Sequence, residues 1–309
     1  MPIRDFGRTG LKVSALGFGG APIGHLKVEP RVVSEILSTL LDNGVNLIDT
    51  AASYFESEVL IGDAISHRRG EYTLVSKCGT RLDDIPEERP YSAGMVTKTI
   101  ERSLRRLRTD HLDVMILHSC DLETLQNGDA LAALRKAKDA GKIRFPAFSG
   151  DNETAAYAAT LPEIAVIEIS VSVPAQHNID AVLPTTGRHN VGVIAKRSMF
   201  NGGWLPVAEQ PAFYRGYIKT YMERFQQMQL NASDLGFDGP PAAVWPEIAL
   251  RFTHSIPGVH TAIVGMTDVQ QVRQNLQSIA KGPLLPKVVQ TIREAFKRNS
   301  PNGAWRGEI

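Results

Sequence analysis

Short apolar runs alternate with longer amphipathic stretches along most of the 309-residue chain. The apolar runs are about four to eight residues long and show no polar alternation, which is typical of strands buried on both faces. The longer stretches repeat their apolar residues at helical spacing, as in the set Val33, Ile36, Leu37 and Leu40. The pattern therefore predicts strands and helices that alternate along the chain.

We expect eight strands from this pattern. They cover Ala15–Gly20, Asn46–Ala51, Tyr72–Gly79, Leu112–His118, Ile143–Phe148, Ile164–Val171, Val191–Ala195 and Thr261–Gly265. Strands that are separated by helices pair in parallel, because the chain crosses back through each helix. Eight similar units favour closure into a (β/α)8 barrel of the TIM type, and an open doubly wound sheet is the competing architecture. Residues 1–309 are expected to form this one domain.

Three segments lie outside the repeated unit. A turn at Arg8-Thr9-Gly10 within Ile3–Gly19 predicts an N-terminal β-hairpin before the first barrel strand. Met199–Pro241 is predicted to be a long loop after the seventh strand, and Leu284–Lys297 a helical tail before the polar terminus Ser300–Ile309. Four aromatic residues are expected to pack the long loop onto the barrel, with a substrate pocket as the alternative: Trp204, Phe213, Tyr214 and Tyr217.

Composition excludes several kinds of partner. The net charge is +1, so no overall field favours nucleic acid. No apolar run reaches the roughly 18 residues that a membrane helix needs, and the first residues lack the apolar core of a secretory signal. Cys78 and Cys120 are too few for a disulfide scaffold, so we expect reduced thiols in a cytoplasmic protein. The expected partner is therefore a small molecule.

Ionisable residues follow three consecutive predicted strands, at the end where a (β/α) barrel carries its active site. Asp49 lies near the end of the second strand, Lys77 near the end of the third and His118 at the end of the fourth. Tyr54 follows five residues after Asp49. Each residue alone has a structural explanation, such as a helix cap or packing. A lysine at the end of an apolar strand is costly unless it is paired, and the four together predict a catalytic site.

The chemistry of these four side chains is coherent. A tyrosine with a pKa of about 10 is a weak acid at neutral pH. An ammonium such as Lys77, about 4 Å away, favours the phenolate by on the order of 4 kcal/mol before desolvation. Asp49 can hold Lys77 protonated, and His118 can orient a reacting oxygen against Tyr54. Such an array moves a proton but no redox electrons, so the chemistry needs a cofactor.

At these residues the chain resembles the aldo-keto reductase family. The matching segments are Asp49-Thr50-Ala51-x-x-Tyr54, Val75-Ser76-Lys77, Leu117-His118 and the opening Gly7-Arg8-Thr9-Gly10-Leu11-Lys12-Val13. The resemblance implies an NAD(P)(H)-dependent oxidoreductase that transfers hydride between nicotinamide and a carbonyl or alcohol. It implies that Tyr54 is the general acid/base and that Lys77 lowers its pKa. It further implies that Asp49 pairs with Lys77 and that His118 positions the carbonyl.

The resemblance also implies the cofactor site. NADP(H) is expected, with NAD(H) as the alternative, and Arg215 in the long loop is expected to close over the cofactor. The N-terminal third is similar to the branch of the family that oxidises sugars and other alcohols. Some positions depart from the family: Gly150, Glu168 and Lys196 stand where an asparagine, a glutamine and an aromatic residue are usual. Gly265, Met266 and Gln271 stand where many relatives place basic or hydroxyl residues. The implied contacts are Gly20, Asp49, Ser149, Glu168, Lys196, Arg197, Ser198, Gly265, Thr267, Gln271 and Asn275.

Three other functions stay open on the sequence. A barrel lysine such as Lys77 can form a Schiff base, as in an aldolase. The departures at the cofactor site are compatible with a non-catalytic regulator that binds nicotinamide cofactor. His118, Asp121 and Asp49 are conceivable ligands in a metal hydrolase, but the histidine spacing of such sites is lacking, so no metal site is predicted.

Overall fold

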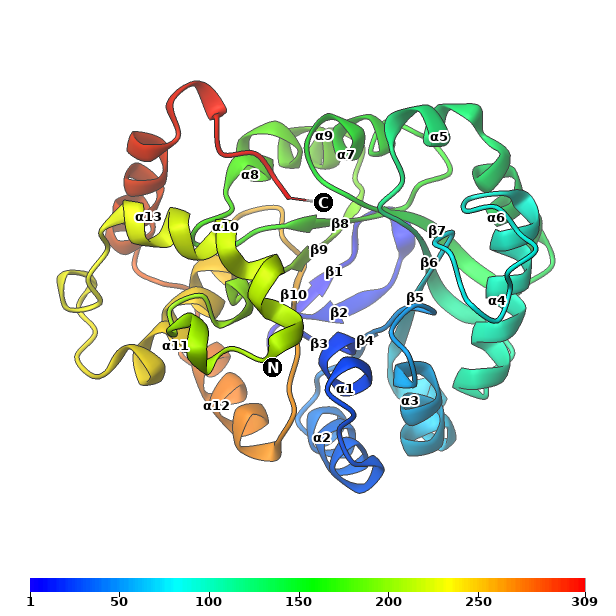
Figure 1. Ribbon diagram of the computed structural model, residues 1–309, viewed down its shortest axis with the longest axis horizontal. Helices are drawn as coiled ribbons and strands as arrows, with labels where there is room; N and C mark the ends of the chain where they lie inside the picture. Colours follow the sequence, from blue (N-terminus) through cyan, green and yellow to red (C-terminus); the bar gives the residue numbers. More distant parts are fainter. Residues whose placement is uncertain (309) are drawn as a thin grey trace.

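The structure, a computed structural model, describes residues 1–308 but not the side chains of residues 212–214, 216 and 217. Parallel strands close into a barrel in the order β10-β3-β4-β5-β6-β7-β8-β9 (Figure 1). The closed order confirms the predicted (β/α)8 barrel and excludes the open sheet. The barrel strands are β3 (Leu16–Gly19), β4 (Leu47–Asp49), β5 (Thr73–Cys78), β6 (Leu112–His118), β7 (Ile143–Ser149), β8 (Val166–Ser170), β9 (Gly192–Lys196) and β10 (Thr261–Val264).

Helices surround the barrel and cover the outer face of its strands (Figure 1). Buried apolar residues of the strands and of the surrounding helices form one core that fills the space between them. Burial of each large apolar side chain contributes roughly 1.5–3 kcal/mol. The helices are α1 (Ala21–His25), α2 (Pro30–Asp42), α3 (Ser57–Ile65), α4 (Ala93–Leu107), α5 (Leu122–Asn127), α6 (Asp129–Asp139), α7 (Asn152–Ala158), α8 (His177–Ala181), α9 (Leu183–Arg188), α10 (Ala212–Met228), α11 (Pro241–Ser255), α12 (Val269–Ala280) and α13 (Pro286–Asn299).

An antiparallel hairpin of β1 (Ile3–Asp5) and β2 (Lys12–Ser14) closes the amino-terminal end of the barrel. Phe6 and Val13 from the hairpin are fully buried among the side chains that point into the barrel. The chain passes so close to β9 at Gly7 that a Cβ atom there would lie 2.3 Å from the backbone nitrogen of Gly192. The predicted hairpin is therefore present, and it leaves the opposite, carboxyl-terminal end of the barrel for a site.

The segment predicted to be a long loop contains the 17-residue helix α10. Ile218, Tyr221, Met222 and Met228 are buried at helical spacing along it, a signal that its many polar residues obscured. Trp204 packs edge-on against Phe200, with ring centres 5.0 Å apart, as expected for a packing residue. The side chains of Phe213, Tyr214 and Tyr217 lie outside the described residues.

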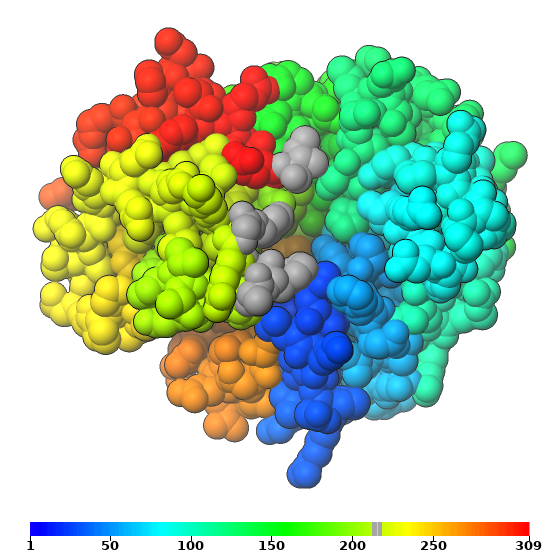
Figure 2. Space-filling view, in the orientation of Figure 1, coloured from blue at the N-terminus to red at the C-terminus, as the bar shows by residue number. Residues whose placement is uncertain are grey.

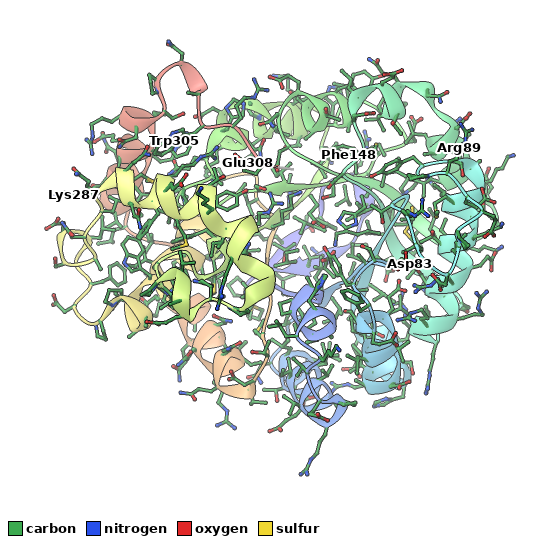
Figure 3. All side chains as sticks on the ribbon, viewed as in Figure 1. Asp83, Arg89, Phe148, Lys287, Trp305 and Glu308 are labelled. Atoms are coloured by element: carbon green, nitrogen blue, oxygen red, sulfur yellow. The ribbon has the colours of Figure 1, made fainter. Side chains whose placement is uncertain are left out.

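Residues 304–308, which we call the C-terminal tail, turn back from α13 towards the middle of the barrel. Gly307 exchanges two hydrogen bonds with the Asn152 side chain, at 2.8 and 3.0 Å. Arg224 of α10 donates to the Arg306 carbonyl at 2.8 Å. Figure 3 shows Trp305 near the outside of the molecule and Glu308 further inward. In the space-filling view the tail lies next to α10 (Figure 2). Ordered backbone contacts therefore hold a segment that the sequence predicted only as a polar terminus.

Candidate active site

The fold brings the four predicted catalytic residues to one end of three neighbouring strands. Asp49 ends β4, Lys77 lies one residue before the end of β5, and His118 ends β6. These strands pair side by side in the barrel, with Asp49 opposite Val75 on β5. Tyr54 lies in the loop between β4 and α3. The carboxyl-terminal rim of the barrel thus carries all four side chains, as the strand pattern predicts.

Lys77 is the central cation of this cluster and is only 1% exposed. Its ammonium donates to Asp49 Oδ1 and, at 3.1 Å, to the Thr50 carbonyl. Glu168 Oε2 from β8 lies 3.2 Å from the same nitrogen. Burial works to lower the pKa of Lys77, but the attraction of Asp49, Glu168 and Tyr54 raises it above its usual range. The lysine therefore stays a charged ammonium in a dry site.

Asp49 pairs with this ammonium in a fully buried position. Burial raises the pKa of its carboxyl well above the usual range, and the neighbouring Glu168 carboxylate adds to the rise. The charge of Lys77 opposes both effects. Two carboxylates thus compete for one cation where little water screens them.

Tyr54 lies beside both Lys77 and His118. The Lys77 ammonium is 5.5 Å from the centre of the Tyr54 ring. The His118 ring meets the Tyr54 ring edge-on at 83°, with centres 5.8 Å apart. The rings and the ammonium are close enough for a ligand oxygen at the phenol to contact more than one of them.

His118 is held in its neutral form. Burial lowers the pKa of its imidazole well below the usual range, and the positive charges of Lys77, Lys196 and Arg197 lower it further. Its buried Nδ1 atom has no hydrogen-bond partner among the described residues. A buried polar atom of this kind is costly unless a bound molecule satisfies it, so the imidazole is suited to contact a ligand.

The residues predicted to hold a cofactor form an arc around the rest of the same rim. They lie on or after β3, β4, β7, β8, β9 and β10, which are neighbours in the closed barrel. At Gly20 a Cβ atom would lie 2.9 Å from the Asp49 carbonyl, so the backbone passes close to β4. The Ser149 hydroxyl accepts from Lys196 Nζ at 3.2 Å and donates to Glu168 Oε1 at 3.4 Å.

Other residues predicted to contact the cofactor also have protein partners. Arg197, at a φ of 59°, donates to the Ser170 hydroxyl at 2.9 Å, to the Tyr221 hydroxyl at 3.0 Å and to the Glu308 carbonyl of the C-terminal tail. Glu168, predicted to hold a carboxamide, lies against Lys77. Arg215, predicted to close over the cofactor, is exposed and donates to the Gln210 carbonyl at 3.1 Å.

Sequence reasoning missed two side chains at this rim. Asp151 is fully buried just beyond β7 and lies 3.6 Å from Arg197 and 3.9 Å from Lys196. It comes two residues after Ser149, so the rule that ionisable residues at the ends of barrel strands form the site could have identified it. His25 of α1 lies 5.7 Å from the Tyr54 ring. Nothing in the pattern around His25 separates it from an ordinary helix end.

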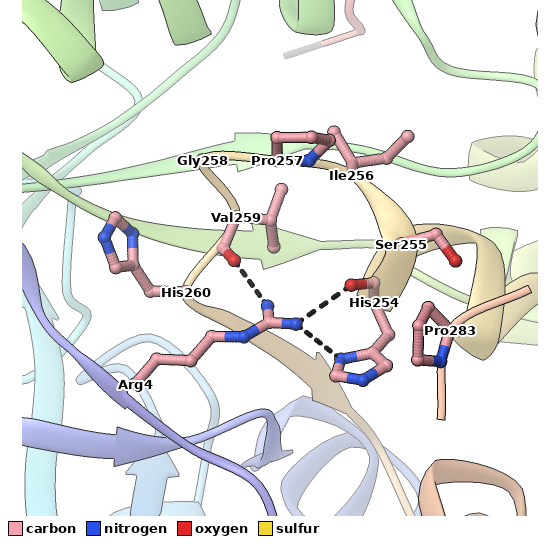
Figure 4. Close-up of a pocket in the computed structure, with 9 residues that line it drawn as sticks. All are labelled: Arg4, His254, Ser255, Ile256, Pro257, Gly258, Val259, His260 and Pro283. Carbon is pink, nitrogen blue, oxygen red and sulfur yellow. Dashed lines mark hydrogen bonds between the residues drawn. The ribbon is translucent and has the colours of Figure 1, made fainter. Parts of the chain in front are cut away.

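A hollow of about 400 Å³ lies at the opposite end of the barrel from these residues (Figure 4). The Arg4 guanidinium there donates to the Val259 carbonyl at 2.5 Å, and contacts the carbonyl and Nδ1 of His254 at 2.9 and 2.7 Å. Burial and the charge of Arg4 lower the pKa of His254 to about 4. Because these hydrogen bonds join Arg4 of β1 to His254 and Val259, we interpret them as holding the hairpin against the barrel rather than as a binding site.

Among the described residues, no group of three histidine, cysteine, aspartate or glutamate side chains is placed to hold a metal ion. Of the helices in residues 1–308, none combines the length and apolarity that crossing a membrane requires.

Together, the closed barrel and the lysine-centred cluster at its rim define a (β/α)8-barrel oxidoreductase. The chain belongs to the aldo/keto reductase family, whose model matches residues 15–297. The holo form of the aldo-keto reductase AKR11C1 from Bacillus halodurans has a similar fold, with a TM-score of 0.80, 26% identity and 96% of each chain covered.

Two curated relatives show how widely this family varies in role. L-galactose dehydrogenase from Arabidopsis thaliana is 25% identical, over 94% of this chain and 92% of that protein. A probable voltage-gated potassium channel subunit beta from the same plant is 23% identical over 94% of each chain. The comparisons thus include both a dehydrogenase and a channel subunit.

Proposed function

We propose that this protein transfers hydride between a nicotinamide cofactor and a carbonyl or alcohol, with Tyr54 as the general acid/base. The observation that carries the proposal is the placement of the Lys77 ammonium and the His118 ring, 5.5 and 5.8 Å from the centre of the Tyr54 ring. The name of the L-galactose dehydrogenase relative favours a sugar or similar polyol as the substrate class.

In this proposal the phenol of Tyr54 exchanges a proton with the reacting oxygen. During reduction the phenol protonates the oxygen of the former carbonyl, and during oxidation the phenolate removes the proton of the alcohol. The buried Lys77 ammonium stabilises the phenolate, because opposite charges attract strongly where water is excluded. Asp49 keeps that ammonium in place by accepting its hydrogen bond.

His118 positions the same oxygen. Since its pKa is depressed, the imidazole is neutral at physiological pH and has one N–H to donate. A neutral donor orients a carbonyl without surrendering its own proton, which leaves proton transfer to Tyr54. The partnerless Nδ1 atom supports this role, because a bound ligand or water would satisfy it.

The rim fits a nicotinamide dinucleotide. Gly20, Ser149, Lys196 and Ser198 would hold its nicotinamide half, and Thr267, Gln271 and Asn275 at the start of α12 its adenosine half, together with Gly265. When bound, the cofactor supplies or accepts the hydride.

The start of α12 favours NAD(H) over the NADP(H) that the resemblance implies. Asp268 Oδ1 accepts from the Gln271 backbone N–H at 2.8 Å, and Gln271 Oε1 accepts from the Thr267 backbone N–H at 2.9 Å. These oxygen atoms occupy the donors that would bind a 2′-phosphate, and the Asp268 carboxylate repels one. Exposed Arg273 is the opposing cation on the next turn.

The test begins with fluorescence titration of NADH and NADPH, followed by a panel of sugars, aldehydes and secondary alcohols. Tyr54→Phe should reduce kcat by at least about a hundredfold while cofactor Kd changes only a few-fold. Tyr157→Phe in α7 is the matched control and should behave as wild type. Unchanged turnover in Tyr54→Phe would refute the proposal.

A non-catalytic regulator is the second candidate, favoured by the potassium channel subunit among the relatives. Cofactor binding without turnover across the whole panel would support it. The Schiff-base aldolase is disfavoured, because Lys77 is held as an ammonium by two carboxylates and lacks a free electron pair. Borohydride trapping at Lys77 in the presence of substrate would reverse that conclusion.

A further inference from the structure

Glu168 connects the catalytic cluster to the cofactor arc. Its Oε2 atom lies 3.2 Å from the Lys77 ammonium but makes no ordinary hydrogen bond among the described residues. Its Oε1 atom accepts from the Ser149 hydroxyl at 3.4 Å. The interaction with Lys77 is therefore mainly Coulombic, and the carboxylate is held by a weak, long hydrogen bond from Ser149.

Lys196 completes the connection from β9. Its ammonium donates to the Ser149 hydroxyl at 3.2 Å and lies 3.9 Å from Asp151 Oδ2. A continuous chain of polar groups thus runs from Lys196 through Ser149 and Glu168 to Lys77. Both ends are cations and the middle is an anion, so each lysine stabilises the charge of Glu168.

We propose that Glu168 is a positioning residue that shares the Lys77 ammonium with Asp49, and that Lys196 balances its charge through Ser149. This inference rests on the proposed function. Glu168 draws part of the Lys77 field away from the phenol and so sets how readily Tyr54 ionises. The family resemblance implies that Glu168 contacts the cofactor carboxamide, whereas this proposal assigns it a role beside Lys77.

The charges of Lys77, Glu168 and Lys196 determine whether each substitution makes Tyr54 ionise more or less readily. Removing the Glu168 charge leaves the Tyr54 phenolate less repelled and the Lys77 ammonium freer to attract it. Removing the Lys196 charge acts in the opposite direction. The titratable and charged groups that face this network are Asp49 from β4, Tyr54 from the following loop, Lys77 from β5, His118 from β6, Asp151 after β7, and Lys196 and Arg197 at the end of β9.

The experiment measures the ionisation of Tyr54 itself. The ultraviolet absorbance of tyrosinate is followed as a function of pH in the full-length protein and in each variant. The curve of the same protein carrying Tyr54→Phe is then subtracted, which leaves the signal of Tyr54. In Glu168→Gln the midpoint for Tyr54 should fall by on the order of one pH unit. In Lys196→Met it should rise, and the double variant should return towards wild type. Glu87→Gln, an exposed carboxylate paired with Lys98, is the control.

The pH profile of kcat/KM is the second readout and should shift in the same direction as the titration. An unmoved Tyr54 midpoint in Glu168→Gln overturns the inference. A rise in cofactor KM with an unmoved midpoint overturns it in favour of the carboxamide contact. If Glu168→Gln does not fold, an unmoved midpoint in Lys196→Met overturns it. The titration needs no substrate, so failure of the proposed function, seen as turnover by Tyr54→Phe, is a separate result.

Discussion

The ammonium of Lys77 lies 5.5 Å from the centre of the Tyr54 ring and forms ion pairs with the carboxylates of Asp49 and Glu168. The lysine is almost completely buried, so its charge depends on Asp49 and Glu168 rather than on water. Removing one partner from a buried ion pair leaves an uncompensated charge, which is far more costly than loss of an exposed pair.

Lys77→Met should therefore lower the free energy of unfolding by about 3–5 kcal/mol as well as abolish turnover. Denaturant unfolding checks the first effect, with Lys98→Met as the matched control. Lys98 is half-exposed and pairs with Glu87 and Glu88 at 2.6 and 2.8 Å, so its loss should change stability far less, because water screens exposed charges. Equal effects of the two substitutions would contradict the buried network.

Stability should fall on acidification because of His118. Its folded-state pKa lies well below the 6.5 of an unfolded histidine, chiefly through burial. Below pH 6.5 this histidine binds a proton in the unfolded chain but stays neutral in the folded protein. The free energy of unfolding therefore decreases as the pH falls. Unfolding measured at about pH 7.5 and about pH 5 should show a smaller loss in His118→Gln. Exposed His67→Gln serves as the control, and an identical loss in both variants would count against this cause.

The hairpin at the amino-terminal end should be sensitive to one added methyl group. Gly7 has a φ of +55°, and its Cβ would meet the Gly192 backbone at 2.3 Å, so Gly7→Ala must displace the hairpin or β9. We expect a loss of more than about 3 kcal/mol in the free energy of unfolding. Gly10→Ala has a similar φ of +71° but open space, and should cost only about 1–2 kcal/mol. Similar losses would show that backbone conformation, and not contact with β9, governs this position.

Cofactor choice should depend on the carboxylate that caps α12. Asp268→Ser keeps a capping oxygen but removes the charge, so the preference for NADH over NADPH should fall by about tenfold. The ratio of the two Kd values from fluorescence titration measures the change. Asp129→Ser in the first turn of α6 is the control. A constant ratio in Asp268→Ser would mean that the charge of this cap has no part in cofactor choice.

The strands of the barrel could be predicted because burial on both faces requires continuous apolar runs. Leu112–His118 was predicted at the bounds that the structure gives. The position of the proposed catalytic cluster followed, because parallel strands bring their carboxyl ends to one rim. Helix α10 was missed because charged and aromatic residues interrupt its buried face, and its contacts rather than its composition stabilise it.

The partners of the site residues could not be predicted in the same way. The sequence indicates that Glu168 lies in a buried strand, but not that Lys77 from a distant strand neutralises it. The C-terminal tail is held through backbone groups such as the Gly307 N–H and the Arg306 carbonyl. Every residue type except proline carries both groups, so no sequence pattern marks such a contact.

The C-terminal tail has a practical consequence for how the protein is handled. Its Glu308 carbonyl meets Arg197, and the Glu308 carboxylate pairs with Arg224 at 2.8 Å. Any peptide joined to the C-terminal tail, such as an affinity tag, would lie close to the Glu308 contact with Arg197 and is expected to perturb kinetics without any change in fold. Strand β1 lies in the hairpin at the opposite end of the barrel, so an affinity tag placed before it would be far from the rim.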